Sequence, residues 1–289
     1  MSLGRARGLA LAAAVLFSTG GAAIKTEAFS AAQVSCIRSG IAAIALLAWA
    51  RRGGRITSGL DLGRAPVLAG IAIAYATVLS LFVLTTKLTT AANAIFLQST
   101  APLYMLALSP WLLGERIRRR DGLYMAALAA GLVLCFAGQP PATTIASNPP
   151  LGNALAAVDG VAWALTLIGL RWAQRDGSDV GIPTVVFGNA IACLIALPFA
   201  WPFPSAPAAE WGMLIYLGVV QIGLAYICLT GAMRTLPAIE VSLLLLIEPV
   251  LNPMWTWLIR GEEPGAWVLA GGAVIIVATA AQSIIASRD

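Results

Sequence analysis

Three ionisable side chains lie within long apolar stretches of this sequence, and they are the first candidates for chemistry. Arg38, Asp159 and Glu248 are each surrounded by apolar residues, and Glu240 stands near one end of the stretch that contains Glu248. A charged residue at the centre of a transmembrane helix costs about 2.5 to 3.5 kcal/mol on insertion scales, so its presence indicates a function by default. For Asp159 and Glu248 a functional and a structural role are both open, and Arg38 is also a candidate for a structural ion pair with one of them.

The two acids have an aromatic and an amide neighbour at helical spacing. Trp163 follows Asp159 by four residues, and Asn252 follows Glu248 by the same interval, which places each pair on one face of a helix. An acid, an amide and an indole could recognise the groups of an amino acid. Trp163 lies midway along its apolar stretch, too deep for the aromatic belt at the membrane surface, so it is either helix packing or part of a cavity wall. Further aromatic and amide candidates are Tyr75, Asn93, Gln98, Tyr104, Gln221 and Tyr226.

The composition is that of a membrane protein. Of the 289 residues, 59% are hydrophobic and 11% are charged, whereas soluble domains carry about 25% charged residues. This excludes a soluble enzyme and a disordered chain. The sequence has no histidine, which excludes histidine-based metal sites and acid–base catalysis. The four cysteines lack the spacing of a metal site or a disulfide framework, so we expect no metal and no cofactor.

Ten apolar runs are long enough to cross the hydrocarbon core as helices, which need about 20 residues each. The sequence therefore predicts an all-α membrane protein with ten transmembrane helices and no soluble catalytic domain. The runs cover residues 7–24, 31–50, 66–86, 90–113, 120–138, 151–172, 181–200, 209–232, 238–259 and 264–286.

The basic residues alternate between the two sides of the membrane. If the N-terminus is inside, fourteen of the 18 Lys and Arg residues fall in cytoplasmic segments, three fall on the opposite side, and Arg38 falls within a run. Cytoplasmic loops carry an excess of Lys and Arg. We therefore expect both termini in the cytoplasm. The net charge of +5 is then explained by loops beside the lipid bilayer, and we expect no nucleic-acid partner.

The chain contains two similar segments. The sequence "AANAIFLQSTAPLYMLALSPWLLGE" from Ala91 aligns without a gap with "AIEVSLLLLIEPVLNPMWTWLIRGE" from Ala238, which pairs Pro102 with Pro249 and one Gly-Glu dipeptide with the other. Each half of the chain holds five runs. Because five is odd, the second half enters the membrane from the opposite side.

This arrangement predicts two inverted five-helix repeats, at residues 1–138 and 151–289, joined by an external linker at residues 139–150. Inverted repeats are typical of secondary transporters, which bind substrate near the membrane midplane between the repeats and alternate access by rocking one against the other. The alternative is a duplication that serves folding alone.

The matched prolines are candidates for gating. Pro102 and Pro249 lie within the fourth and ninth runs, and Pro253 follows Pro249. A proline inside a helix removes a hydrogen bond and bends the axis. We expect kinks at these positions, which would either form a pair of gates or shape the bundle.

With ten runs in two halves, each carrying a proline and then Gly-Glu before its last helix, the chain resembles the EamA-type exporters of the drug/metabolite transporter superfamily. The resemblance covers essentially the whole chain, and it is greatest to bacterial exporters of aromatic amino acids. It implies a protein of the bacterial inner membrane that exports amino acids, with other small metabolites or drugs as alternative substrates. A monomer suffices for this function.

Two other classes and the mode of coupling remain open. A channel or scaffold is the less favoured alternative to a carrier, and no constellation for an intramembrane enzyme is found. No Walker motif is present, so an ATP-driven pump would need a partner chain. Proton coupling, uniport and exchange are all compatible with the sequence.

Overall fold

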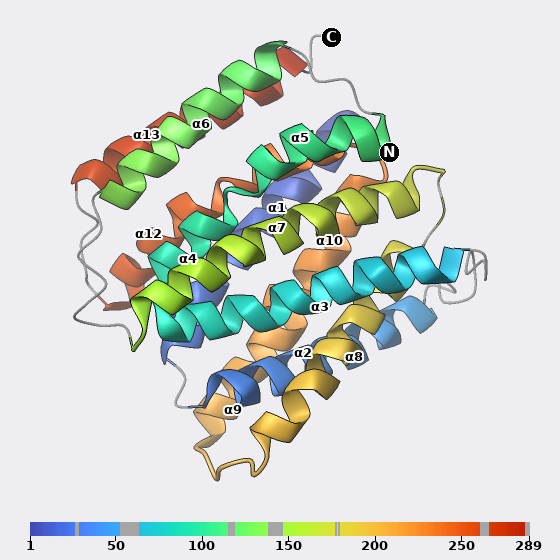
Figure 1. Cartoon of the computed structure of the whole chain (residues 1–289), viewed down its shortest axis with the longest axis vertical. Coiled ribbons are helices and arrows are strands. Elements are labelled where there is room, and N and C mark those ends of the chain that lie inside the picture. Colours follow the sequence, from blue (N-terminus) through green and yellow to red (C-terminus); the bar gives the residue numbers. More distant parts are fainter. Residues whose placement is uncertain are drawn as a thin grey trace.

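A computed structural model describes residues 1–26, 29–52, 64–114, 119–137, 147–176, 178, 180–260 and 266–286. Every regular element among these residues is a helix (Figure 1). The first half contributes α1 (Leu3–Thr26), α2 (Ala31–Arg52), α3 (Ala65–Leu88), α4 (Ala91–Gln98), α5 (Ala101–Leu113) and α6 (Arg119–Ala137). The second half contributes α7 (Pro149–Gln174), α8 (Gly181–Ala200), α9 (Ala208–Tyr216), the π-helix η3 (Leu217–Leu224), α10 (Ala225–Met233), α11 (Ala238–Leu245), α12 (Glu248–Arg260) and α13 (Ala266–Ala286).

Six helical stretches within the described residues are long and apolar enough to cross a membrane. They are α1, α2, α3, α7, α8 and the continuous stretch from α9 through η3 to α10. The predicted apolar runs are helical over nearly all of their described residues. The all-helical part of the predicted fold class is therefore confirmed, and six of the helical stretches have the length and composition of membrane spans.

Two of the predicted runs are each split into a pair of helices. Residues 99–100 separate α4 from α5, and residues 246–247 separate α11 from α12. Pro102 and Pro249 lie in the first turn of the second helix of each pair, where a missing N–H costs nothing. The expectation of a bend within a continuous helix is therefore wrong at both prolines, because the helix stops and restarts. Pro253 lies within α12, and its side chain is outside the described residues.

The helices pack through small residues. One face of α1 carries Ala6, Ala10, Ala13 and Ala14, all with no exposed surface. Between lipid-embedded helices there is no hydrophobic driving force, so close van der Waals packing of small side chains holds them together. The pair α6 and α13 forms one side of the bundle and the pair α2 and α8 the other (Figure 1). The helices α1, α3, α7 and α10 lie between them.

The π-helix η3 packs closely on α1. A Cβ atom at Gly20 would lie 2.6 Å from Nε2 of Gln221, so glycine makes room for this side chain. π-helices are rare and occur frequently at functional sites. This element places Gln221 and Ile222 in the centre of the bundle.

Candidate functional site: a central cavity with charged and aromatic walls

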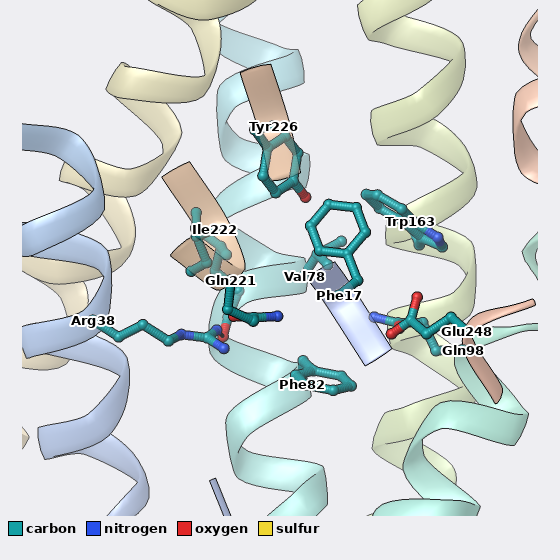
Figure 2. Close-up of a pocket in the computed structure, with 11 residues that line it drawn as sticks. Phe17, Arg38, Val78, Phe82, Gln98, Trp163, Gln221, Ile222, Tyr226 and Glu248 are labelled. Atoms are coloured by element: carbon teal, nitrogen blue, oxygen red, sulfur yellow. Dashed lines mark hydrogen bonds between the residues drawn. The ribbon is translucent and has the colours of Figure 1, made fainter. Parts of the chain in front are cut away.

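A small cavity of about 40 Å³ lies where helices of the two halves meet (Figure 2). Its walls combine two charged side chains, two amides and a set of aromatic and aliphatic groups. The lining residues are Phe17, Arg38, Val78, Leu79, Phe82, Gln98, Trp163, Gln221, Ile222, Tyr226 and Glu248.

The two charges of the cavity stand on opposite sides. Arg38 enters from α2, and Glu248, the first residue of α12, enters from across the cavity (Figure 2). Only 1% and 8% of their surfaces are exposed. Nη2 of Arg38 donates a hydrogen bond to the carbonyl oxygen of Leu79 at 3.0 Å. Among the described residues Arg38 has no ion pair within 4.0 Å, so the structural bridge to Glu248 or Asp159 is not formed.

Asp159 lies behind the cavity wall. Its side chain is fully buried in α7 and does not line the cavity. Nε2 of Gln98 donates to Oδ2 of Asp159 at 2.9 Å, and Gln98 itself faces the cavity. The amide therefore connects the buried acid to the space where Glu248 is found.

An aromatic cluster forms part of the cavity wall. Phe17 packs edge-on against Trp163 and Tyr226, with ring centroids 6.1 and 5.1 Å apart. Tyr75 supports Tyr226 from behind at 4.6 Å, and its hydroxyl accepts a hydrogen bond from Nδ2 of Asn189 at 2.9 Å. Offset and edge-on ring contacts stabilise such clusters. Trp163 thus both packs and lines the cavity.

Besides Asp159, the predicted cavity residues Tyr75, Asn93, Tyr104 and Asn252 are not part of the lining. Tyr75 is behind the wall, as described. Nδ2 of Asn93 hydrogen-bonds to Thr89 and Asn153 near the start of α4. Asn252 is buried against α1, where a Cβ atom at Gly21 would lie 2.6 Å from its Nδ2. Helical spacing put Asn252 near Glu248, but the side of α12 that carries it faces another helix.

Apolar wall residues escaped the sequence analysis. Phe17, Val78, Leu79, Phe82 and Ile222 line the cavity but resemble ordinary core residues. Phe17 carried one signal, because it is the single aromatic residue in an α1 sequence made largely of small side chains. No comparable signal marks the others.

Two segments that together span most of the chain, residues 5–137 and 150–283, match the EamA-like transporter family. The chain belongs to the EamA-like transporter family. The transporter is therefore a multi-pass membrane protein, and membership indicates transport rather than catalysis. The match to two successive segments agrees with the two similar halves of the sequence.

Curated relatives extend this likeness. The transporter is 31% identical over 194 residues to the pseudopaline exporter CntI of two Pseudomonas aeruginosa strains, UCBPP-PA14 and PAO1. The alignment covers 66% of the transporter and 66% of each exporter, slightly less than two thirds of either chain. It is also 26% identical to an uncharacterized transporter of Clostridium kluyveri, covering 76% of the transporter and 71% of the relative. These relatives support the family but not the expected subgroup of aromatic amino-acid exporters.

A solved structure supports the fold. One crystal structure superposes on the transporter with a TM-score of 0.81 at 20% identity, covering 99% of each chain. At this level of identity the likeness concerns the fold alone.

The transporter has a second hollow where α1 begins and α10 ends. Its lining includes Arg5, Gln174, Thr230 and Arg234, and its volume is about 570 Å³. Two ion pairs at this end of the bundle each join the first half of the chain to the second. They are Arg7 Nε to Glu240 Oε1 at 2.7 Å and Arg64 Nη2 to Asp176 Oδ2 at 2.6 Å.

Proposed function

We propose that the protein is a secondary exporter of amino acids and amino-acid-like zwitterions across the bacterial inner membrane. The observation that carries this proposal is the placement of Arg38 and Glu248 on opposite sides of the central cavity (Figure 2). A guanidinium binds a carboxylate with charge-assisted hydrogen bonds, and a carboxylate binds an ammonium. Opposite charges on the two sides of one cavity suit a substrate that carries both charges itself.

The wall between the charges suits an apolar side chain. Phe17, Phe82 and Trp163 are aromatic, and Val78 and Ile222 are aliphatic. The chemistry of this lining therefore favours aromatic and other apolar amino acids as substrates. The likeness to CntI favours pseudopaline or a similar metabolite as a second candidate substrate.

We infer that the transporter works by alternating access between two inverted five-helix repeats, at residues 1–138 and 151–289, with residues 139–150 as the linker. The gapless alignment that pairs residue 91 with residue 238 also superimposes the helix bounds, since α4 and α5 correspond to α11 and α12 residue for residue. Helix contacts correspond in the same way: α3 packs on α7 as α10 packs on α1, and α4 packs on α7 as α11 packs on α1. These pairings support a two-fold relation and ten crossings.

The same arrangement supports an orientation. α1 begins and α13 ends at one end of the bundle (Figure 1). Arg5, Arg7, Arg64 and Arg234 lie at that end, as the excess of basic residues in cytoplasmic loops requires. We assign this end to the cytoplasm, with the hollow lined by Arg5 and Arg234 as the path by which substrate enters.

Counterflow in proteoliposomes tests the proposed function. Vesicles with purified protein are loaded with an unlabelled compound and exposed to its labelled form, using L-phenylalanine, L-tryptophan, L-leucine, L-alanine, L-lysine and pseudopaline. We expect saturable counterflow of zwitterions. Arg38→Gln and Glu248→Gln should each lower the initial rate at least tenfold, while Arg51→Gln, at the exposed end of the same helix as Arg38, should leave it unchanged.

Two outcomes would contradict the proposal. Unsaturable flux would indicate a channel, and the absence of counterflow with every compound of the panel would reject an amino-acid carrier. Normal counterflow in both Arg38→Gln and Glu248→Gln would show that transport does not depend on these two charges.

A further inference from the structure

Asp159 is enclosed in a way that substrate binding does not explain. Its exposed fraction is 0%, and it does not line the cavity. Oδ2 accepts a hydrogen bond from Gln98, whereas Oδ1 has no hydrogen-bond partner among the described residues. A buried charge that is neither paired nor fully hydrogen-bonded is strongly unfavourable. Binding one proton removes that charge.

The interruption between α4 and α5 is packed against α7 beside this acid. A Cβ atom at Gly160 would lie 2.9 Å from the carbonyl oxygen of Leu97 and 3.1 Å from Oγ1 of Thr100, so only glycine allows the contact. Broken helices in transporters supply groups for substrate and coupling-ion sites near the midplane. Here the break fixes Gln98, the last residue of α4, between Asp159 and the cavity.

The charges around Asp159 favour a single small cation. Arg38 on α2 and Glu248 on α12 act on it electrostatically, and Tyr75 on α3 and Tyr226 on α10 are the titratable groups that share the interior with Arg38. With Arg38, Glu248 and Asp159 all ionised, the interior holds one positive and two negative charges. The described residues contain no group of three side chains suited to a metal.

We propose that Asp159 is a proton-binding site and that the side-chain amide of Gln98 transmits its occupancy to the substrate cavity. An ionised carboxylate only accepts hydrogen bonds, so it holds the amide nitrogen of Gln98 and leaves the amide oxygen for a substrate ammonium. A protonated carboxyl group donates a hydrogen bond, so it holds the amide oxygen and turns the amide nitrogen toward the cavity. The amide nitrogen of Gln98 and the substrate ammonium are both hydrogen-bond donors, so they cannot bind each other. A proton on Asp159 and a substrate in the cavity therefore exclude one another.

The consequence is exchange of substrate for a proton. On the side with fewer protons Asp159 is ionised and the cavity accepts substrate. On the side with more protons Asp159 is protonated and substrate is released. The exchange rests on the proposed function, whereas the proton site itself does not.

The proton site is tested without substrate by infrared titration of the purified wild-type protein. We expect a carboxylic-acid C=O band that grows as pH falls within the range above about pH 6, where solvent-exposed carboxyl groups are still ionised. This band should persist in Glu248→Gln and be lost in Asp159→Asn. Asp176→Asn serves as the matched control, because this acid follows the same helix but faces solvent, and it should retain the band. An unchanged band in Asp159→Asn would overturn the proposal.

The coupling is tested in proteoliposomes with the panel compound that gives the highest counterflow. An outward or inward gradient of one pH unit should drive accumulation of up to about tenfold for one-to-one exchange, and entrapped pyranine should report the opposing proton flux. Substrate accumulation is divided by the counterflow rate of the same variant, which corrects for differences in transport activity. In Asp159→Asn this ratio should fall to the value measured without a pH gradient, and in Asp176→Asn it should remain at the wild-type value.

The outcomes separate the two hypotheses. Loss of counterflow with every compound rejects the proposed function, while the infrared titration still decides the proton site. Counterflow without proton flux, or accumulation driven by a sodium gradient at constant pH, overturns the proton coupling and leaves the exporter intact. If Asp159→Asn fails to fold, the wild-type proton flux and the band retained in Glu248→Gln remain decisive.

Discussion

We expect Trp163 to set the preference among apolar substrates. Its ring meets Phe17 and Tyr226 and borders the cavity, so a substrate ring would join an existing cluster of edge-on contacts. We expect Trp163→Ala to weaken binding of L-tryptophan and L-phenylalanine by up to about tenfold, since one aromatic contact contributes about 0.5 to 1.5 kcal/mol. L-Alanine should be affected less. Competition against labelled substrate in counterflow measures the change.

Trp111→Ala is the control for this variant, because the side chain of Trp111 is 89% exposed. It should leave all affinities unchanged. If Trp163→Ala inserts normally and binds every compound as the wild type does, Trp163 is packing only.

The sequence predicted the charged part of the site better than the apolar part. Arg38 and Glu248 were recognisable because a charge within an apolar helix is costly. Phe82 and Ile222 were not, since apolar residues in a membrane helix face lipid, protein or cavity alike. The prediction that Asn252 lines the cavity failed for a different reason. Its four-residue spacing places it on the same helix face as Glu248, but this spacing does not determine which neighbouring helix that face contacts.

At the scale of elements, α2 and α8 form the contact between the two halves that is most open to a direct test. The Sγ atoms of Cys36 and Cys193 lie 3.4 Å apart as free thiols. We expect oxidation by copper phenanthroline to link them, and mass spectrometry of non-reduced peptides should find a bond between residues of α2 and α8.

Cys36→Ser should abolish this cross-link, while Cys228→Ser should not change it. A cross-link between Cys228 and Cys193 instead would show that α10, and not α2, lies beside α8 at this position.

The ion pair between Arg64 and Asp176 joins the start of α3 to the end of α7. The hydrogen bond from Arg64, together with those from Ser178, holds the pKa of Asp176 below its usual value. A lowered pKa gives stability that is present above the unfolded-state pKa of about 4 and is lost only as pH falls below it. We therefore expect Asp176→Asn to change the melting temperature equally at pH 5.5 and pH 8.

Because both side chains of this pair are partly exposed, the loss should stay under about 1 kcal/mol and shrink with added salt. Thermal unfolding in detergent measures it. A destabilisation that appears only at the higher pH would show that Asp176 titrates in this range and that its pKa is not lowered.

The sequence patterns did not predict the two helix interruptions, between α4 and α5 and between α11 and α12. The prolines were visible, but a proline inside an apolar run predicts a kink and a helix start equally well. The break between α4 and α5 packs against Gly160, and such a contact between segments far apart in the sequence is not visible in a local pattern.

For the whole molecule, the orientation can be tested by labelling single cysteines in a cysteine-free background. An impermeant thiol reagent added to intact cells should label a cysteine at Ser147 and not one at Arg51. We expect this because Ser147 adjoins the linker between the halves and Arg51 lies at the end where α1 begins. The reverse pattern would invert the topology and the direction of transport.

The all-helical class was predictable because a helix that crosses the membrane must satisfy its own backbone hydrogen bonds and be apolar along its length. Apolar runs such as residues 31–50 and 181–200 agree closely with α2 and α8. The arrangement of these helices in space was not predictable in the same way, since it depends on which small-residue faces meet.

The π-helix η3 bears on how the two halves of the molecule diverged. Its counterpart in the first half, α3, is a continuous α-helix. The hydrogen bonds of a π-helix join residues five apart, so each loop contains one residue more than in an α-helix. Converting η3 to a regular α-helix would therefore require the deletion of one residue. One residue fewer would rotate everything beyond it by about 100° and carry Tyr226 away from the cavity. If the two halves arose by duplication, as the proposed repeat implies, the insertion of one residue in the second half would be sufficient to make the proposed binding site asymmetric.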